Sequence, residues 1–284
     1  MNWIRGGFRR LLPMLLAITL AASALQAETL RAVQNRIAGV LAHPELRQAR
    51  VGTVVVSLDR GETICRDAGD LPLLPASNMK LVTCATALEL LGGAYDCSTV
   101  PGAKPGETLS SFSSRTLKPS DNDLANALLD WLPSAAGRSD LTPRQLCSET
   151  WGERGVYLYG ARWNDGSGLS RMDRLSADMV LGLLRCMDGS RWREEFIRAL
   201  PVAGVDGTLR RRMVGTIAQR RVQAKTGTLT GVSALSGYAR TLSGERLAFS
   251  IIMNGHTCGP ERVRRMQDHV CIALVGLERE EGSR

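Results

Sequence analysis

Segments with the residue pattern of β-strands lie near both ends of the chain, and a long helix-patterned block separates them. Residues 51–58 are mostly β-branched, and a turn at 59–62 leads into an apolar segment at 63–65, which predicts a hairpin. Three more strand-like segments, joined by short turns, follow at 222–229, 232–241 and 246–253. This order predicts an α/β protein of the α+β type, with one antiparallel sheet from both chain ends, helices packed on it and an inserted helical lobe.

Helical periodicity accounts for much of the remaining sequence. We expect helices at residues 29–41, 77–91, 121–132, 142–151, 176–187, 191–200 and 260–277. The helix that begins near Ser77 stops at Gly92 and carries its apolar residues, Cys84 among them, on one stripe. Residues 98–114 are rich in Ser, Pro and Gly, and we expect a loop with little regular structure there. The pattern predicts a single domain at 28–284, with a helical subdomain at about 77–215.

The N-terminus has the features of a secretory signal peptide. Three arginines in the first ten residues precede an apolar run at 11–20, and small residues follow up to Ala27. The run is short for a membrane-spanning helix, and Pro13 interrupts it. We therefore expect a signal peptide at residues 1–27, cleaved after Ala27 or alternatively after Ala24, and a periplasmic mature protein without a transmembrane segment.

The composition is that of a globular protein, with 44% hydrophobic and 23% charged residues. The formal net charge is +8, of which the first 27 residues contribute +3, so the excess is moderate and does not predict a nucleic-acid partner. The seven cysteines include no C-x-x-C pair, and their pairing stays open. The three histidines are not spaced as metal ligands. We expect neither a metal nor a cofactor.

Ser77 and Lys80 form the first candidate for chemistry. Positions i and i+3 of a helix lie on one face, roughly 5–6 Å apart at Cβ, so the lysine can reach the serine. This geometry suits a lysine that deprotonates a serine nucleophile. Since both residues are common, the pair needs partners elsewhere in the chain.

Two further motifs supply such partners. Ser120-Asp121-Asn122 stands at the start of a predicted helix, and Lys225-Thr226-Gly227-Thr228 stands in the first strand of the C-terminal group. Together with Ser77-x-x-Lys80, these motifs resemble the S-x-x-K, S-D-N and K-T-G signature of class A β-lactamases and penicillin-binding proteins. The order of the motifs, and the elements that carry them, fit that signature.

A wider resemblance narrows the family. The chain resembles the D-alanyl-D-alanine carboxypeptidase/endopeptidase family of penicillin-binding proteins, the low-molecular-mass class C serine DD-peptidases. The matching segments are 74–92, 118–129, 164–177, 200–211 and 224–238. The segment 165–170, Asp-Gly-Ser-Gly-Leu-Ser, is the best discriminator from serine β-lactamases. Only 39 residues separate Lys80 from Ser120, so the domains that this family usually inserts there are missing.

The residue types fit an acyl-transfer reaction. Ser77 Oγ attacks a carbonyl to give an acyl-enzyme, which water later hydrolyses. A lysine is protonated at neutral pH, but burial and a nearby second cation both lower its pKa. Lys225 is the expected second cation, and Lys80 is the expected general base.

The resemblance implies roles for the other motif residues. Ser120 passes a proton to the leaving D-alanine amine, and Asn122 holds the backbone of the substrate. The terminal carboxylate of the substrate is bound by Lys225, Thr226 and Thr228. Gly227 lets the substrate approach the strand. The backbone N–H groups of Ser77 and Thr228 form the oxyanion hole.

Other polar residues have simpler interpretations. A basic patch comprises Arg210, Arg211, Arg212, Arg220 and Arg221. We expect it to be a solvated rim in preference to a contact with anionic cell-wall polymer. Asp165 and Asp206 each precede a glycine and are expected to be turn residues.

The sequence therefore predicts a serine-type D-Ala-D-Ala carboxypeptidase, with endopeptidase action left open. It is a hydrolase of peptidoglycan peptide stems, with β-lactams as covalent inhibitors. Two alternatives remain: a β-lactamase or esterase on the same fold, and a catalytically idle cell-wall or β-lactam binding protein.

Overall fold

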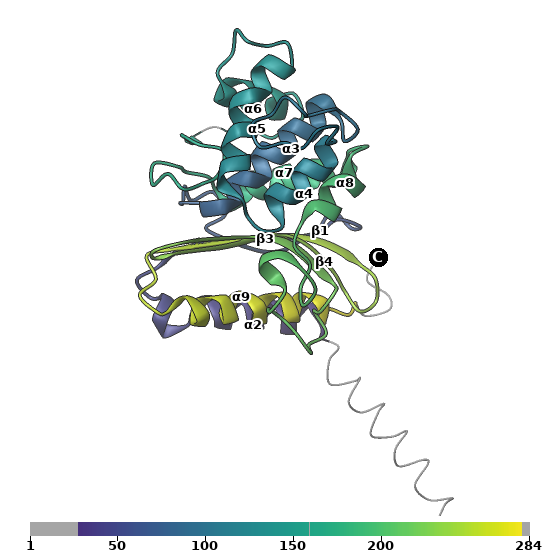
Figure 1. The fold of residues 1–284 in the computed structure, drawn as a ribbon. Helices are drawn as coiled ribbons and strands as arrows, with labels where there is room; N and C mark the ends of the chain where they lie inside the picture. The colour runs from purple at the N-terminus through teal and green to yellow at the C-terminus, as the bar shows by residue number, and fades with distance from the viewer. Residues whose placement is uncertain (1–27, 159, 280–284) are drawn as a thin grey trace, which may run out of the picture.

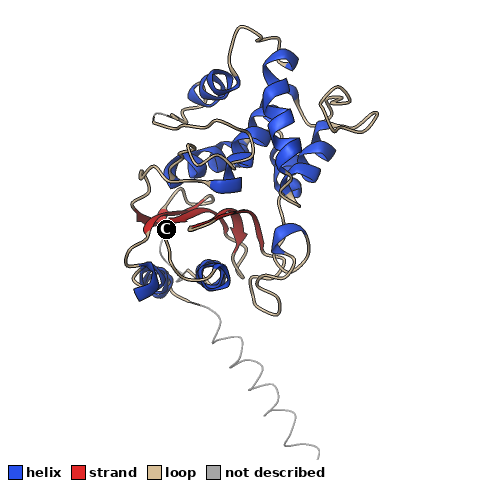
Figure 2. Cartoon of the chain, turned by 60° about the vertical axis from the view of Figure 1, so that its left-hand side comes forward, coloured by secondary structure: helices blue, strands red, loops and turns tan. Residues whose placement is uncertain are grey.

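The computed structural model describes residues 28–158 and 160–279, so the predicted signal peptide lies outside the described residues. A five-stranded sheet forms a middle layer, with two long helices on one face and a larger group of helices on the other (Figures 1 and 2). Within those ranges, no helix is both long enough and apolar enough to cross a membrane.

The sheet is antiparallel and joins both ends of the chain, as predicted. Its strands are β1 Arg50–Ser57, β2 Thr63–Asp67, β3 Val222–Leu229, β4 Val232–Arg240 and β5 Arg246–Asn254. They lie in the order β2-β1-β5-β4-β3, so β3 forms one edge. The N-terminal hairpin joins the C-terminal strands through β1 and β5, where Arg50 pairs with Asn254 and Ser57 with Leu247.

Two helices cover one face of the sheet. They are α2 Leu30–Leu41 and α9 Pro260–Val275, which lie side by side beneath the strands (Figure 1). Their apolar sides pack with residues such as Val55, Leu235 and Phe249 in one core cluster. Since helices cover both faces, eight of the nine residues of β4 are buried.

In the part of the chain that the structure describes, the helical lobe on the other face contains six α-helices. These are α3 Met79–Leu91, α4 Leu109–Leu117, α5 Asn122–Ala135, α6 Pro143–Gly152, α7 Ala177–Gly189 and α8 Arg193–Ala199. Helix α3 lies at the centre, and every residue from Met79 to Leu88 is buried, Cys84 included. The expectation of a single apolar stripe was wrong, because a helix surrounded by other helices buries its whole circumference.

The prediction of a loop at 98–114 was also wrong in its second half. Helix α4 begins after Thr108, whose side chain accepts a hydrogen bond from Ser111 N. Phe112 and Leu117 bury the apolar side of α4 against the lobe. Tertiary packing therefore overrides the weak helix propensity of a serine-rich segment.

The seven cysteines all lie in the described part of the chain, and all are free thiols. Four of them are buried, Cys84 among them, as expected for a small apolar side chain.

Candidate active site

Ser77 lies at the N-terminal end of α3, facing a cleft of about 1100 Å³ between the helical lobe and the edge strand β3. The structure differs slightly from the prediction here, because Ala76–Asn78 forms a 3₁₀ turn and the α-helix begins at Met79. Helices often begin with such a turn, and the three-residue spacing still brings Lys80 next to Ser77. The serine side chain is partly exposed to the cleft.

The Lys80 amine is held in a closed network. Its Nζ donates hydrogen bonds to Ser77 Oγ at 2.9 Å, to Asn122 Oδ1 at 2.7 Å and to the carbonyl of Ser167 at 2.7 Å. The side chain is fully buried. Three acceptors arranged around one nitrogen fix its position beside the serine hydroxyl.

Burial also changes the charge of this amine. Loss of hydration lowers the pKa of Lys80 to about 8, although the negative charges of Asp165 and Asp121 oppose the change. The pKa of Lys225, which is buried as well, is lowered well below its ordinary value by burial and then by repulsion from Lys80. We expected Lys225 to be the cation that lowers the pKa of Lys80. Burial is the main cause of the lowered pKa of both lysines, and the mutual repulsion of the two amines adds to it.

Strand β3 presents a free edge to the cleft. In its first half this edge is covered, because Ala224 N donates to the carbonyl of Pro201 at 3.0 Å. From Lys225 onward, the described residues supply no backbone partner on that side. Since backbone groups alternate along a strand, the N–H and C=O groups of Thr226 and Thr228 point to the same edge as those of Ala224. Of these groups, the Thr226 carbonyl accepts a hydrogen bond from Lys225 Nζ at 2.9 Å. An extended peptide can add to the sheet there.

Two glycines allow the serine turn to pack closely. Ala76, next to Ser77, has the unusual φ of +47°. A Cβ on Gly168 would lie 1.8 Å from the carbonyl oxygen of Ala76, and a Cβ on Gly227 would lie 2.7 Å from that of Pro75. We expected Gly227 to let the substrate approach the strand, and the structure shows that it also makes room for the turn that carries Ser77.

The Ser120-Asp121-Asn122 motif forms the opposite wall. Ser120 lines the cleft with a positive φ of +67°. Asp121 caps α5 by accepting a hydrogen bond from Leu124 N at 3.0 Å. Asn122, the first residue of α5, accepts a hydrogen bond from Lys80. The motif thus places one hydroxyl on the cleft wall and one amide against the base.

The two aspartates interpreted as turn residues have that role in the structure. Asp165 accepts hydrogen bonds from the backbone N–H groups of Ser167, Gly168 and Ser170. It thereby shapes the loop whose carbonyl holds Lys80. Asp206 accepts from a backbone N–H in its own turn and pairs with Lys118 at 2.5 Å.

Several cleft residues were not recognised in the sequence. The Ser167 carbonyl lies within the Asp-Gly-Ser-Gly segment but carries no side-chain signal. Thr208 Oγ1 accepts a hydrogen bond from Thr226 Oγ1 at 2.7 Å. The cleft is also lined by Arg210, Arg211, Arg212, Arg264 and Arg265. The first three were expected to be a rim, and the last two have no recognisable pattern.

Comparison with known proteins identifies the family. The sequence model of the D-Ala-D-Ala carboxypeptidase 3 (S13) family matches residues 33–106 and 103–275. The chain belongs to the S13 family. Among curated S13-like relatives, the D-alanyl-D-alanine carboxypeptidase of Actinomadura sp. strain R39 is 46% identical over 138 residues, which is 46% of this chain and 25% of that protein.

Solved structures share the fold. Penicillin binding protein 4 from Haemophilus influenzae has a TM-score of 0.70 at 13% identity, covering 82% of this chain and 97% of that one. The TLA-1 extended-spectrum β-lactamase has a TM-score of 0.64 at 12% identity, covering 87% and 98%. The S13 chain therefore has the β-lactamase/DD-peptidase-like fold that the sequence predicted.

The matched region is a fraction of the curated relatives. The alignments cover 25% of the Actinomadura protein and 31% of a relative from H. influenzae. All three motifs that form the cleft lie within the residues matched by the S13 model.

Proposed function

We propose that this protein is a serine DD-peptidase that removes the terminal D-alanine of peptidoglycan stem peptides through an acyl-enzyme on Ser77. One observation carries the proposal: the buried Lys80 amine, with its lowered pKa, lies 2.9 Å from Ser77 Oγ. Membership of the S13 family supports the choice of substrate.

Acylation begins when neutral Lys80 accepts the proton of Ser77 as Oγ attacks the carbonyl between the two D-alanines. The oxyanion is stabilised by the N–H groups of Ser77 and Thr228, the latter on the free edge of β3. When the carbon–nitrogen bond breaks, Ser120 donates its hydroxyl proton to the leaving amine and receives in its place the proton that Lys80 took from Ser77, so that both return to their starting forms. Water then attacks the ester on Ser77, which releases the shortened peptide and restores the hydroxyl.

Substrate binding prepares the base. The terminal carboxylate is bound by Lys225, with the hydroxyl groups of Thr226 and Thr228 as further donors. A carboxylate beside Lys225 favours the charged form of this lysine. That charge then favours the neutral form of Lys80, because the two amines repel each other.

The reaction takes place outside the cytoplasm in this proposal. Residues 1–27 contain a basic region, an apolar run and small residues in that order, which supports export to the periplasm, where peptidoglycan lies. β-Lactams are proposed to acylate Ser77 in place of the peptide, which fits the structural similarity to penicillin binding protein 4 from H. influenzae.

Mass spectrometry of the purified protein tests the proposal directly. The protein is mixed with benzylpenicillin and, separately, with a peptide that ends in D-Ala-D-Ala. We expect a long-lived adduct on Ser77 and release of D-alanine. Ser77→Ala should abolish both, whereas Ser134→Ala, at an exposed serine in α5, should change neither.

Three results would contradict the proposal. An adduct on the Ser77→Ala protein would exclude this serine as the nucleophile. Rapid turnover of penicillin without an adduct would favour the β-lactamase alternative. A stable adduct with no peptide hydrolysis would favour the idle binding protein.

A further inference from the structure

The cleft continues beyond the K-T-G strand. The Thr226–Thr208 hydrogen bond joins this strand to the turn Gly207–Leu209 on the cleft wall. Past this pair, the cleft runs along the turn Gly207–Leu209 and over the first half of α9. We call this extension the arginine arm, and its basic residues are Arg210, Arg211, Arg212, Arg264 and Arg265.

Two of these arginines are neutralised locally. Arg212 pairs with Asp268 at 2.7 Å, and it is mostly buried. Arg264 pairs with Glu261 at 3.2 Å. These contacts use both acidic residues that line the arm.

The other three arginines have no such compensation. Within the described ranges, the structure gives no ion pair or side-chain hydrogen bond to Arg210, Arg211 or Arg265, and all three are exposed. Three positive charges therefore face one end of a cleft that also contains Ser77. A concave site lined with charges of one sign concentrates ligands of the opposite sign.

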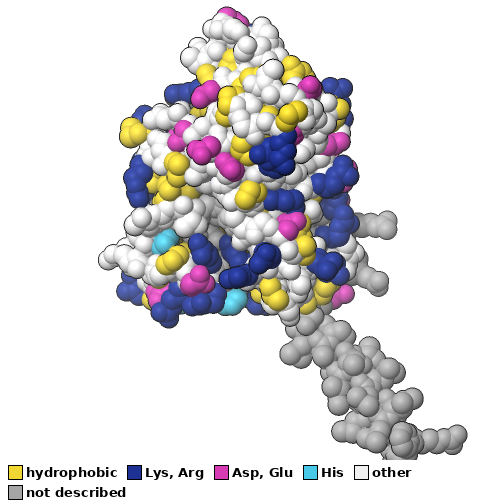
Figure 3. Space-filling model, viewed as in Figure 1, with side chains coloured by type: hydrophobic (Ala, Val, Ile, Leu, Met, Phe, Trp, Pro, Cys, Tyr) yellow, Lys and Arg dark blue, Asp and Glu magenta, His cyan; other side chains and the backbone are white. Residues whose placement is uncertain are grey.

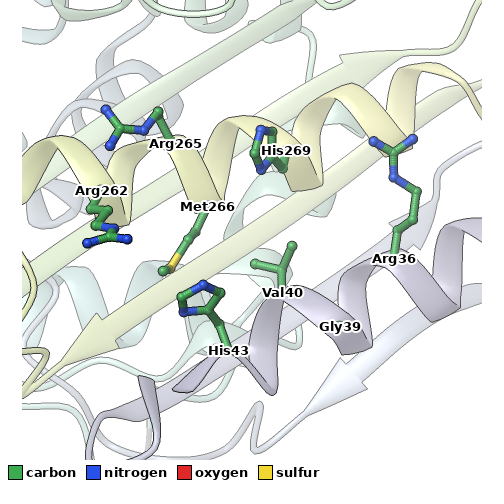
Figure 4. A pocket seen from close by; sticks show the side chains of 8 residues that line it. All are labelled: Arg36, Gly39, Val40, His43, Arg262, Arg265, Met266 and His269. Atoms are coloured by element: carbon green, nitrogen blue, oxygen red, sulfur yellow. The ribbon is translucent and has the colours of Figure 1, made fainter. Parts of the chain in front are cut away.

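The arm differs from the other basic hollow on this side of the molecule. Lysines and arginines gather over the α2–α9 layer in Figure 3. Figure 4 shows the groove between the two helices, where Arg36 and Arg262 lie at the ends. These two arginines pair with Glu28 and Glu45, so their charge is offset. Arg265 lines both pockets, and its side chain extends from α9 on the side away from α2 (Figure 4).

We propose that the arginine arm binds carboxylates on the side chain of the leaving residue, so that the cleft prefers substrates whose departing amino acid is acidic. The inference rests on the proposed function, which places the terminal carboxylate at Lys225, Thr226 and Thr228. The methyl group of a leaving D-alanine is too short to reach beyond these three residues. A longer acidic side chain on the same residue extends past Thr208 into the arm.

The position of the arm favours this ligand over a separate anionic polymer. The three unpaired arginines line the same cleft as Ser77 and Ser120, whereas a polymer bound independently of catalysis needs no connection to the nucleophile. Carboxylates suit guanidinium groups because the planar donors match two oxygens at once.

The test compares three peptides that share an acylated lysyl-D-alanyl part and end in D-alanine, D-glutamate or D-lysine. We expect kcat/KM to be highest for D-glutamate and lowest for D-lysine. Each exposed charge pair contributes about a 1.5- to 5-fold effect, so the three arginines together predict roughly a tenfold preference for D-glutamate over D-alanine. The preference should decline with added salt.

Two variants test whether the arginines of the arm cause the preference for an acidic leaving residue. The double variant Arg210→Ser, Arg211→Ser should lower the D-glutamate to D-alanine ratio severalfold. Arg265→Glu should shift the preference toward D-lysine, a gain that misfolding cannot produce. Arg185→Ser removes one exposed charge from α7 in the helical lobe, and it should leave the preference as in the unmodified protein.

The outcomes separate this inference from the proposed function. If the D-alanine peptide is cleaved but the rates are equal for all three leaving residues, the proposed role of the arginine arm is wrong. So does a loss of binding to poly-glutamate in the variants without any change in the substrate ratio, because the arm then serves a polymer. If the unmodified protein forms no penicillin adduct and cleaves none of the peptides, the proposed function itself fails.

Discussion

The protonation state of Lys80 sets how fast Ser77 can be acylated. In the proposed mechanism only the neutral amine can take the proton of Ser77, so the acylation rate follows the neutral fraction of Lys80. The pKa of Lys80 is lowered by burial to about 8. The second-order rate constant for acylation by penicillin should therefore rise with pH, with a midpoint near pH 8.

The size of the effect follows from this pKa. Half of the Lys80 amines are neutral at pH 8, and about 1% are neutral at pH 6, so the rate constant should fall roughly 50-fold between these values. If Lys80 had the ordinary lysine pKa of about 10.4, the rise of the rate constant would be centred more than two pH units higher. The two cases differ well beyond the error of a kinetic measurement.

Stopped-flow measurement with a chromogenic β-lactam between pH 5.5 and 9.5 gives the profile. Asp121→Asn should move the midpoint to lower pH, because the charge of Asp121 raises the pKa of Lys80. Asparagine is as good a helix N-cap as aspartate, so α5 should keep its start. Asp140→Asn, at a remote and exposed carboxylate, should leave the midpoint unchanged.

Lys80→Arg extends the test. An arginine stays protonated over this range, so acylation should be about 10²- to 10⁴-fold slower without recovery at high pH. The reasoning would be refuted by a flat profile between pH 6 and 9. A shift to higher pH in Asp121→Asn would refute the electrostatic part of it.

Two further substitutions test the loop that surrounds the site. Gly168→Ala should abolish acylation and destabilise the protein by several kcal/mol in denaturant unfolding, because the new Cβ would lie 1.8 Å from the carbonyl oxygen of Ala76. The control is Gly137→Ala, which has a similar positive φ but open space around it and should cost only about 1 kcal/mol. Asp173 is fully buried, and burial raises the pKa of its carboxyl to about 7. Because the folded state prefers the neutral acid, the wild-type protein should lose about 2 to 3 kcal/mol of stability between pH 5 and pH 8. Asp173→Asn should lack this loss. An equal pH dependence of stability in the two proteins would contradict a raised pKa of Asp173.

Much of the fold was predictable because strand and helix patterns depend on local sequence. The β-branched run at 51–58 and the three C-terminal strands each appear within one or two residues of their predicted ends. The three motifs also predicted a common cleft, and the structure brings Ser77, Lys80, Asn122 and Lys225 together. Their catalytic roles stay proposals until the variants are measured.

The errors of prediction share one physical cause, which is dependence on neighbours distant in the sequence. Helix α4 forms because Phe112 and Leu117 pack against the lobe, and nothing in the serine-rich segment reveals that contact. The Ser167 carbonyl acts through its backbone, so no residue type marks it. Arg265 joins the cleft only because α9 passes beside Gly207–Leu209, and sequence spacing cannot show this proximity.

The pairing of β1 with β5 has a consequence for the order in which the molecule is made. Strand β1 emerges early in synthesis, but its partner β5 follows about two hundred residues later. The sheet therefore cannot close, and Lys225 cannot meet Lys80, until nearly the whole chain is available. Such distant pairing slows folding, which suits the proposed export of an unfolded chain. In the proposed mechanism, Ser77 thus gains the partners that activate it only at the last stage of folding.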